Sequence, residues 1–295
     1  MAATKHFGKI PHQDLAIATA CDAKYFKSVL NLAGSLESSA GIKYQLYIYD
    51  LGLRPLQHWI LKGLPNVTVS SVPAFTKYWK QCWSWKVWIW KYTPGDNFLY
   101  LDAGVEVLRS LQPFVSLMDK YGYALVSQSD KNHPHLVRDI TPDDFFEKYK
   151  LDKKFANEPV IAAGIIGLNK HSKFYSSIID KVYEAVKEGD NLGWSKSEMS
   201  RNAGIHYMDN PPLRNCRLFR HDQTVLSVLV YKYQNPLVLQ QLEKFAGYKT
   251  PHDHPKQVVW HHRRQSKLPY IRTLRYAKTS PVRWLVLKFV GGRFW

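Results

Sequence analysis

The sequence predicts an α/β protein in which helices flank a mostly parallel central sheet. Within the first hundred residues, four short apolar runs alternate with amphipathic segments, and this alternation is typical of βαβ units. Asp22, Asp50 and Asp102 each follow the end of one of these runs. Parallel sheets bind ligands at the carboxyl ends of their strands, so these acidic residues mark the expected position of a site.

Each predicted strand is a short apolar run, and each predicted helix carries apolar residues at helical spacing. In the first half, strands are predicted at residues 15–20, 44–49, 67–72 and 98–102. The helices between them are predicted at residues 24–38, 53–61 and 83–92. Gly41 ends the first helical region, and Pro94 and Gly95 form the turn before the fourth strand.

The second half is less regular than the first. Strands are predicted at residues 123–128 and 160–168, and helices at residues 171–187 and 222–233. Another helix is expected to open at Thr141 and Pro142, with Thr141 as its N-cap. Residues 188–220 are rich in Gly, Asn, Pro and Ser and are predicted to form a long loop, which in a compact domain is usually functional.

The composition is that of a folded, strongly basic protein. The 295 residues are enough for a large core, and contents of 45% hydrophobic and 22% charged residues argue against disorder. The net charge of +17 favours anionic partners such as nucleotides, nucleic acid or an acidic membrane surface. The three cysteines are far apart, and neither a secretion signal nor a run of 18 apolar residues is visible, so a cytoplasmic location is expected.

The first motif is an apolar strand that ends in Asp102, Ala103 and Gly104. This segment resembles the D-x-D element of the GT-A glycosyltransferases, which hold a nucleoside diphosphate sugar there. The L-x-P-F sequence of residues 111–114, expected to form a turn, and the W-K sequence that ends in Lys86 extend the resemblance. It implies that Lys86 and the D-A-G residues contact the donor. Gly104 stands where the family has its second Asp, the stronger metal ligand in those enzymes.

The same resemblance implies a divalent metal ion, Mn2+ or Mg2+, because the leaving diphosphate develops negative charge that a cation stabilises. The predicted ligands are Asp102, Glu106 and His261. Glu106 follows Asp102 by four residues and faces the same side of an extended chain, although a surface Glu is the simpler interpretation. His262 and Arg263 are expected to face the diphosphate, unless this segment is only a basic surface loop.

The second motif is Asp222 followed by Gln223, at the start of a predicted helix. It resembles the D-Q helix start of retaining glycosyltransferases such as family 8. This resemblance implies catalytic roles, in which Asp222 holds hydroxyls of the donor sugar and Gln223 lies beneath the sugar. The free N–H groups and the positive dipole end of a helix N-terminus also suit that position. The alternative is that Asp222 only caps its helix.

Further residues complete the predicted donor site. Ala163 and Gly164 lie in a strand that resembles the glycine-containing strand between the two motifs, where small residues let the backbone approach the donor sugar. Members of the family bind the base and ribose after their first strand. The residues expected near the nucleotide, by that resemblance and by position, are Ala20, Asp22, Tyr25 and Asp50.

Residues 1–264 are predicted to form the GT-A-like domain, with a donor-binding half at about 14–130 and an acceptor half at about 131–264. Residues 265–295 form a basic, aromatic extension, since nine Lys or Arg and no acidic residue occur from Arg263 onward. Such a segment is typical of a helix on an anionic membrane surface. We expect peripheral attachment to the cytoplasmic face, beside a lipid-linked acceptor. The alternative is a C-terminal helix that packs on the domain.

The sequence therefore predicts a glycosyltransferase that moves a sugar from a nucleoside diphosphate sugar to a glycan or lipid-linked glycan acceptor. By resemblance the donor is a UDP-sugar and the configuration is retained. Two other classes stay open. The missing second Asp is compatible with a catalytically degenerate protein that only binds its ligand. The basic charge is compatible with a nucleic-acid-binding protein, but no common recognition motif is present, so nucleic acid is not expected as a partner.

Overall fold

The computed structural model describes residues 15–128, 135–196, 212–234, 237–240, 245–247 and 255–261. Its centre is a six-stranded sheet in the order β3-β2-β1-β4-β7-β6. The strands are β1 (Leu15–Cys21), β2 (Tyr44–Asp50), β3 (Val67–Ser71), β4 (Asn97–Leu101), β6 (Tyr123–Ser127) and β7 (Ile161–Asn169). The first four run parallel, and β7 is antiparallel to β4 and β6. The predicted α/β class with a mostly parallel sheet is confirmed.

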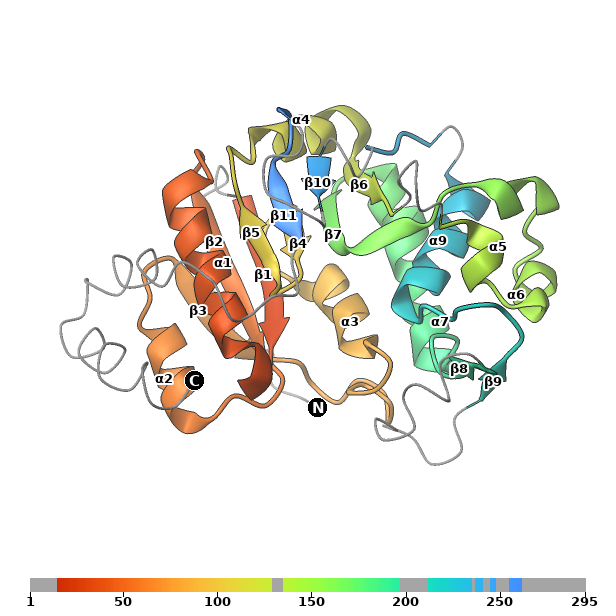
Figure 1. Cartoon of the computed structure of the whole chain (residues 1–295), viewed down its shortest axis with the longest axis horizontal. Coiled ribbons are helices and arrows are strands. Elements are labelled where there is room, and N and C mark those ends of the chain that lie inside the picture. The colour runs from red at the N-terminus through yellow and green to blue at the C-terminus, as the bar shows by residue number, and fades with distance from the viewer. Residues whose placement is uncertain are drawn as a thin grey trace.

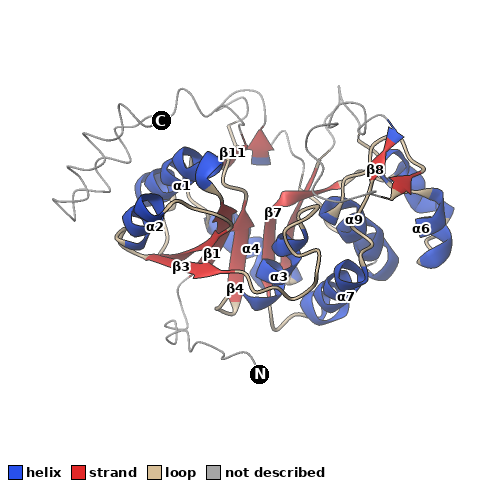
Figure 2. Ribbon diagram, turned by 90° about the horizontal axis from the view of Figure 1, so that it is seen from below, coloured by secondary structure: helices blue, strands red, loops and turns tan. Residues whose placement is uncertain are grey.

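Helices cover this sheet, and further helices form a second part of the molecule beside it. They are α1 (Phe26–Ser39), α2 (Pro55–Lys62), α3 (Ser84–Tyr92), α4 (Gln112–Tyr121), α5 (Val137–Ile140), α6 (Asp143–Lys148), α7 (Asp180–Glu188) and α9 (Asp222–Tyr233). Figure 1 shows α1 and α2 in one part of the molecule and α5, α6, α7 and α9 in the other, with α3 between them. The view in Figure 2 shows the same division. Because α3 also contacts α7 and α9, it joins the two parts.

Both faces of the sheet are apolar and buried at its central strands β1 and β4. On β1, Ile17 packs in the cluster that includes Phe26 of α1, whereas Ala16 and Ala18 pack in the cluster that includes Trp90 of α3. This arrangement follows from the alternation of side chains along a strand. It also explains why β1 is a continuous apolar run in the sequence, since strands covered on both faces have no polar side.

Three local features differ from the prediction. The L-x-P-F segment is not an isolated turn, because Leu111 is the N-cap of α4 and Pro113 lies in the first turn, where a missing N–H costs nothing. Thr141 ends α5 instead of capping the next helix, and Pro142 is the N-cap of α6. The predicted long loop contains two short paired strands, β8 (Trp194–Ser195) and β9 (Leu213–Arg214).

A second, smaller sheet brings distant parts of the chain together. In it, β5 (Val105–Val107) pairs antiparallel with β11 (Val259–His261), and β11 pairs parallel with β10 (Ala246–Gly247). His261 lies opposite Val105 in this register. None of these strands was predicted, since two or three residues carry no periodic signal. Their pairing places His261 near the end of β4.

Three parts of the sequence-based prediction lie outside the described residues: His262, Arg263 and the extension at residues 265–295. Among the helices that the structure describes, none has both the length and the apolar character needed to cross a bilayer. Attachment of the extension to a membrane surface therefore stays a prediction.

Candidate active site

The acidic residues predicted at strand ends do lie there. β1 ends at Cys21, directly before Asp22, and β2 ends at Asp50, which is opposite Cys21 in the sheet. β4 ends at Leu101, directly before Asp102. Because β1 lies between β2 and β4, the three carboxylates follow neighbouring parallel strands at one edge of the sheet.

The carboxylate of Asp102 has a separate set of partners for each oxygen. Its Oδ1 accepts a hydrogen bond from the Tyr100 hydroxyl at 2.9 Å and lies 2.9 Å from Lys86 Nζ. Its Oδ2 faces His261, whose Nε2 is 3.8 Å away. Burial opposes ionisation of this carboxyl group, but Lys86, His261 and the hydrogen bonds outweigh burial and lower the pKa of Asp102 below its ordinary value. Asp102 is therefore an anion at neutral pH.

Lys86 lies between two carboxylates. It belongs to the first turn of α3, and its buried ammonium is 2.9 Å from Asp102 Oδ1 and 3.7 Å from Asp222 Oδ2. Burial acts to lower the pKa of Lys86, but the two carboxylates outweigh burial, so the net shift is upward. The ammonium also lies 5.6 Å from the centre of the Tyr100 ring, within cation–π distance. The residue predicted to contact the donor is thus a buried, permanently charged cation.

Gly164 leaves the space in which Asp102 and His261 face each other. Its carbonyl on β7 accepts a hydrogen bond from the Asp102 N–H at 2.8 Å. A Cβ at this position would lie 2.6 Å from Asp102 Oδ2 and 3.1 Å from His261 Cε1, closer than packed side chains tolerate. The neighbouring Ala163 instead packs in the apolar cluster beneath α3 and α9. The absence of a side chain at Gly164 is therefore a geometric requirement of the site.

Asp222 is the first residue of α9, and the cap of this helix is His221. The alternative that Asp222 serves only as the N-cap is therefore wrong. Asp222 is buried, and burial raises the pKa of its carboxyl group to about 7, although Lys86 opposes the shift and Asp102 adds to it. Asp102 and Asp222 share one ammonium, and their pKa values move in opposite directions. Such divergence is typical of carboxylates in active sites.

Gln223 has an amide group that is fixed by two hydrogen bonds. Its Nε2 donates to Gln128 Oε1 at 2.6 Å and to the carbonyl of Ile161 at 2.7 Å. Both N–H groups are used in this way, so the amide oxygen is the group that remains to face a ligand. One turn further along α9, Ser227 Oγ accepts a hydrogen bond from the N–H of Ile161 at 3.1 Å. Both contacts fix the start of α9 against the start of β7.

The structure brings together two of the three predicted metal ligands. Asp102 Oδ2 and His261 Nε2 face each other over Gly164. Of these two groups, the carboxylate is a preferred ligand of Mn2+ and Mg2+, whereas an imidazole is preferred by other metal ions. Glu106 is directed elsewhere, because the chain turns after Asp102 and Glu106 Oε2 accepts a hydrogen bond from Asn31 of α1 at 3.3 Å. Within the described part of the chain, no group of three His, Cys, Asp or Glu side chains could hold a metal ion. The prediction of Glu106 as a third ligand is corrected accordingly.

Asp22 and Asp50 stabilise local turns. Asp22 Oδ1 accepts hydrogen bonds from the two backbone N–H groups that open the following 3-10 helix. Asp50 Oδ1 accepts two more from the turn after β2, and its Oδ2 lies 2.9 Å from His58 Nδ1. Tyr25 is exposed beside Asp22. These contacts account for both carboxylates without a ligand, so their part in nucleotide binding stays a prediction.

The remaining predicted donor residues are small or lie outside the described residues. Ala20 and Ala103 are buried at the ends of β1 and β4. Gly104 lies in the turn between β4 and β5. A backbone hydrogen bond of 2.9 Å from the Val105 N–H to the Asp102 carbonyl closes this turn. His262 and Arg263 directly follow the last residue described in β11. Their contact with a diphosphate stays a prediction.

Three residues of the site were not predicted from the sequence. Tyr100 could have been found, because a residue two positions before Asp102 on the same strand points to the same side. Gln128 holds Gln223 from the end of β6, and only the folded arrangement shows this. His221 caps α9 with a positive φ of 55°. His rarely adopts this conformation, and no feature of the sequence predicts it.

No protein-family model and no curated protein matches this sequence, whereas solved structures match it in fold. The bifunctional glycosyltransferase WbbM has a TM-score of 0.57 at 11% identity, and the match covers 96% of this chain and 52% of that one. This chain thus spans about half the length of WbbM. An active-site mutant of LgtC has a TM-score of 0.50 at 15% identity, with 90% and 96% of the two chains covered.

Mouse xyloside xylosyltransferase 1 has a TM-score of 0.51 at 11% identity, and the match covers 87% of this chain and 100% of that one. At such low identities, the likeness concerns the arrangement of helices and strands. This chain has the GT-A fold of the glycosyltransferases.

Proposed function

We propose that this chain is a glycosyltransferase that moves a sugar from a nucleoside diphosphate sugar to a glycan or lipid-linked glycan acceptor. We expect the donor to be a UDP-sugar. One observation carries the proposal: the ammonium of Lys86 lies between the carboxylates of Asp102 and Asp222 at the carboxyl end of β4, in a GT-A fold. Three separate segments supply these charges. Burying them costs desolvation energy, which favours a functional origin over a purely structural one.

On the leaving-group side, the bond between the anomeric carbon and the diphosphate breaks, and the diphosphate oxygen gains negative charge. A divalent ion bound by Asp102 and His261 would supply positive charge against that oxygen. The hydrogen bond from Tyr100 and the ion pair with Lys86 hold the other oxygen of Asp102. They keep the carboxylate in one orientation, in the way that outer partners position ligand side chains at other metal sites.

On the sugar side, positive charge develops on the ring as the diphosphate leaves. The ionised form of Asp222 and the amide oxygen of Gln223 would stabilise that charge. The two hydrogen bonds that Gln223 donates support its part, because they leave the oxygen as its free acceptor. In the proposed step, the acceptor hydroxyl attacks the anomeric carbon from the face that the diphosphate leaves. The departing diphosphate oxygen takes the hydroxyl proton, and the configuration is retained.

A screen of UDP-, GDP- and CMP-sugars with and without Mn2+ tests the proposed activity. We expect hydrolysis of, or transfer from, one donor class. Asp102→Ala and Gln223→Ala should each lower the rate by about a hundredfold or more while the fold is kept. Wild-type rates in both variants would contradict the site assignment. Donor binding without turnover would identify a degenerate binding protein, and salt-sensitive binding of DNA or RNA without donor binding would identify the nucleic-acid class.

The proposal includes the basic extension at residues 265–295, which we place on an anionic membrane surface on the cytoplasmic side. The nine Lys and Arg from Arg263 onward support it, because each basic residue near such a surface contributes about 1 kcal/mol. Flotation with anionic liposomes tests this part. Deletion of residues 268–295 should abolish flotation, and unchanged flotation would contradict membrane binding.

A further inference from the structure

An exposed indole lies one helical turn from the charged centre. Trp83 precedes α3 directly, and 41% of its surface is exposed. Its carbonyl accepts a hydrogen bond from the N–H of Lys86 at 3.0 Å. Other aromatic side chains of this chain are exposed to a similar extent, but this indole lies close to buried charges, where its face is open to a ligand.

The backbone that presents this indole has an unusual conformation. Cys82 and Trp83 both have positive φ values, 47° and 57°, in the left-handed region that glycine favours. Neither residue is glycine, so the surrounding structure must impose the conformation. Residues held in this way cluster at binding and catalytic sites.

Asn191 imposes the conformation from the other part of the molecule. Its side chain is buried, and its Nδ2 donates to the carbonyl of Cys82 at 2.9 Å and to Ser84 Oγ at 2.7 Å. Its own carbonyl accepts a hydrogen bond from His221 Nδ1 at 3.1 Å. One residue thus fixes both the turn that carries Trp83 and the residue before Asp222.

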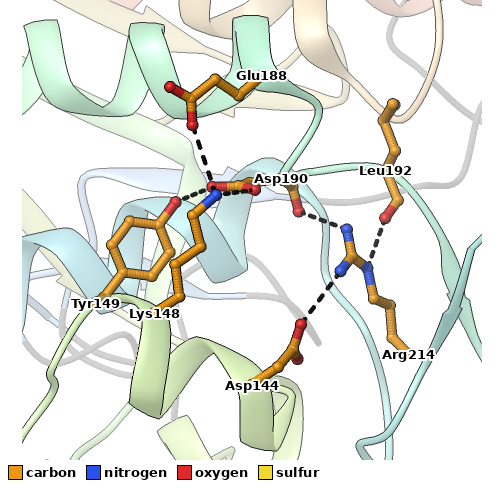
Figure 3. Close-up of polar contacts among 7 residues, drawn as sticks. All are labelled: Asp144, Lys148, Tyr149, Glu188, Asp190, Leu192 and Arg214. Atoms are coloured by element: carbon orange, nitrogen blue, oxygen red, sulfur yellow. Dashed lines mark hydrogen bonds and ion pairs between the residues drawn. The ribbon is translucent and has the colours of Figure 1, made fainter.

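Asn191 is in turn anchored by the polar contacts shown in Figure 3. Lys148 and Tyr149 bind the carboxylate of Asp190. Arg214 donates from Nε to the carbonyl of Leu192 at 2.8 Å and from Nη2 to the carbonyl of Asp190 at 3.3 Å. Side-chain contacts within the protein therefore fix both neighbours of Asn191.

Aromatic rings pack behind the exposed indole of Trp83. The ring of Trp83 lies 4.9 Å from the ring of His221, and His221 lies 4.7 Å from Trp194 in an edge-on arrangement. His221 directly precedes Asp222. The indole is therefore supported by packed rings, and through His221 it lies next to the start of α9, where Asp222 and Gln223 are proposed to face the donor sugar.

We propose that Trp83 is the stacking platform for a sugar ring of the acceptor. This inference rests on the proposed glycosyltransferase function and names its acceptor class: a saccharide whose pyranose ring presents its C–H face to the indole. An aromatic face offers a large, rigid apolar contact at low entropic cost, and sugar rings offer a matching apolar face. The contact holds an acceptor hydroxyl near the anomeric carbon of the donor sugar, on the face that the diphosphate leaves.

The test separates acceptor binding from donor chemistry. Trp83→Ala should raise the acceptor KM by roughly tenfold or more, whereas hydrolysis of the donor by water and the thermal shift caused by the donor stay within about twofold of wild type. Trp83→Phe keeps a ring and should recover part of the loss. Trp59→Ala removes a comparably exposed indole on α2 and should leave the acceptor KM unchanged.

Two outcomes would overturn the proposal. An unchanged acceptor KM in Trp83→Ala would show that the indole does not touch the acceptor. An equal loss of transfer, donor hydrolysis and donor-induced thermal shift would place Trp83 at the donor instead. If the wild type neither hydrolyses nor transfers any donor sugar, the proposed function fails separately. An oligosaccharide array without donor then decides: binding lost in Trp83→Ala supports the platform, and equal or absent binding in both proteins contradicts it.

Discussion

The ammonium of Lys86 lies 2.9 Å from Oδ1 of Asp102, and the lysine side chain is buried. A cation in this position neutralises two carboxylates at once, because Asp222 Oδ2 is 3.7 Å away on the other side. Removing it would leave the ionised Asp102, and Asp222 in its ionised form, without their shared counter-charge in a poorly hydrated place. The Lys86 side chain therefore contributes to the stability of the whole fold as well as to the chemistry of the site.

We expect Lys86→Met to lower the free energy of unfolding by about 3 kcal/mol, the usual cost of breaking a buried ion pair. Urea denaturation measures the change. The control is Lys187→Met, which breaks an exposed pair with Glu184 on α7 and should cost less than about 1 kcal/mol. Equal effects of the two substitutions would show that the Lys86 cluster does not stabilise the fold.

Gly164→Ala should damage the site through its Cβ, which would lie 2.6 Å from Asp102 Oδ2. Lys86 and Tyr100 restrain Asp102, so the carboxylate can move away only by breaking those contacts. The control is Gly167→Ala on the same strand, where the Cβ would meet Ala124 and Met118 instead. Both should lose about 1–3 kcal/mol of stability from overpacking.

Only Gly164→Ala should also abolish the thermal shift caused by the donor. Gly167→Ala should keep that shift, since its Cβ meets the apolar side chains of Ala124 and Met118 and not Asp102 or His261. If donor binding survives in Gly164→Ala, Asp102 does not hold the donor.

β1 and β4 were predictable because each is a nearly continuous apolar run covered on both faces. The small sheet was not, because β5 and β11 come from distant segments and only their pairing defines them. The error at Glu106 has the same origin. The prediction assumed an extended chain after Asp102, but the hydrogen bond from Val105 N–H to the Asp102 carbonyl closes a turn there.

The site was predictable as separate motifs but not as a cluster. Asp102, Lys86 and Asp222 were each assigned to the donor from their own segments. The sequence contains no signal that one ammonium lies between both carboxylates, since that depends on how α3 packs between β4 and α9. The strained turn at Trp83 was also hidden, because Asn191, more than a hundred positions away, imposes it.

Asp222→Asn should change the pH dependence of stability. Burial raises the pKa of Asp222 to about 7 in the folded state, above the ordinary value of 3.8. A raised folded-state pKa gives stability that is fully present below the unfolded pKa and is lost as pH rises through the folded pKa. The wild type therefore loses this contribution between about pH 4 and pH 7, whereas the asparagine variant has nothing to lose there.

Melting temperatures of both proteins across that range measure the effect. The stability of Asp222→Asn relative to wild type should increase with pH, by at most about 4 kcal/mol. Asp152→Asn is the control, because the N-cap hydrogen bond from the Lys154 N–H and the contact with the Lys154 side chain lower the pKa of that exposed carboxyl group. Its difference from wild type should stay constant above about pH 5. A constant difference for Asp222→Asn as well would show that Asp222 is ionised across the range.

His261→Ala should weaken the response to metal. If Asp102 and His261 hold Mn2+ beside the diphosphate, loss of the imidazole should raise the Mn2+ concentration for half-maximal donor stabilisation by about tenfold or more. Glu106→Gln is the matched control, because its amide still accepts a hydrogen bond from Asn31 and should leave the Mn2+ response unchanged. A loss in Glu106→Gln equal to that in His261→Ala would restore Glu106 as a ligand. A donor response that is insensitive to EDTA in the wild type would remove the metal from the proposal.

Asn191→Ala should release the turn that presents Trp83. The substitution removes two buried hydrogen bonds, to the Cys82 carbonyl and to Ser84 Oγ. We expect a loss of about 2 kcal/mol or more. Acceptor KM should rise together with this loss, because these two hydrogen bonds hold the residues on either side of Trp83.

The control is Asn215→Ala, which removes one exposed hydrogen bond to Asp143 and should change stability by less than about 1 kcal/mol. Asn191→Asp keeps an acceptor but loses both donated hydrogen bonds, so it should behave like the alanine variant and not like wild type. Amide hydrogen exchange then locates the effect: residues 82–86 should exchange faster in both Asn191 variants, while the strands of the central sheet keep their protection. Uniformly faster exchange would instead mean that Asn191 stabilises the fold as a whole and does not specifically hold the turn beneath the indole.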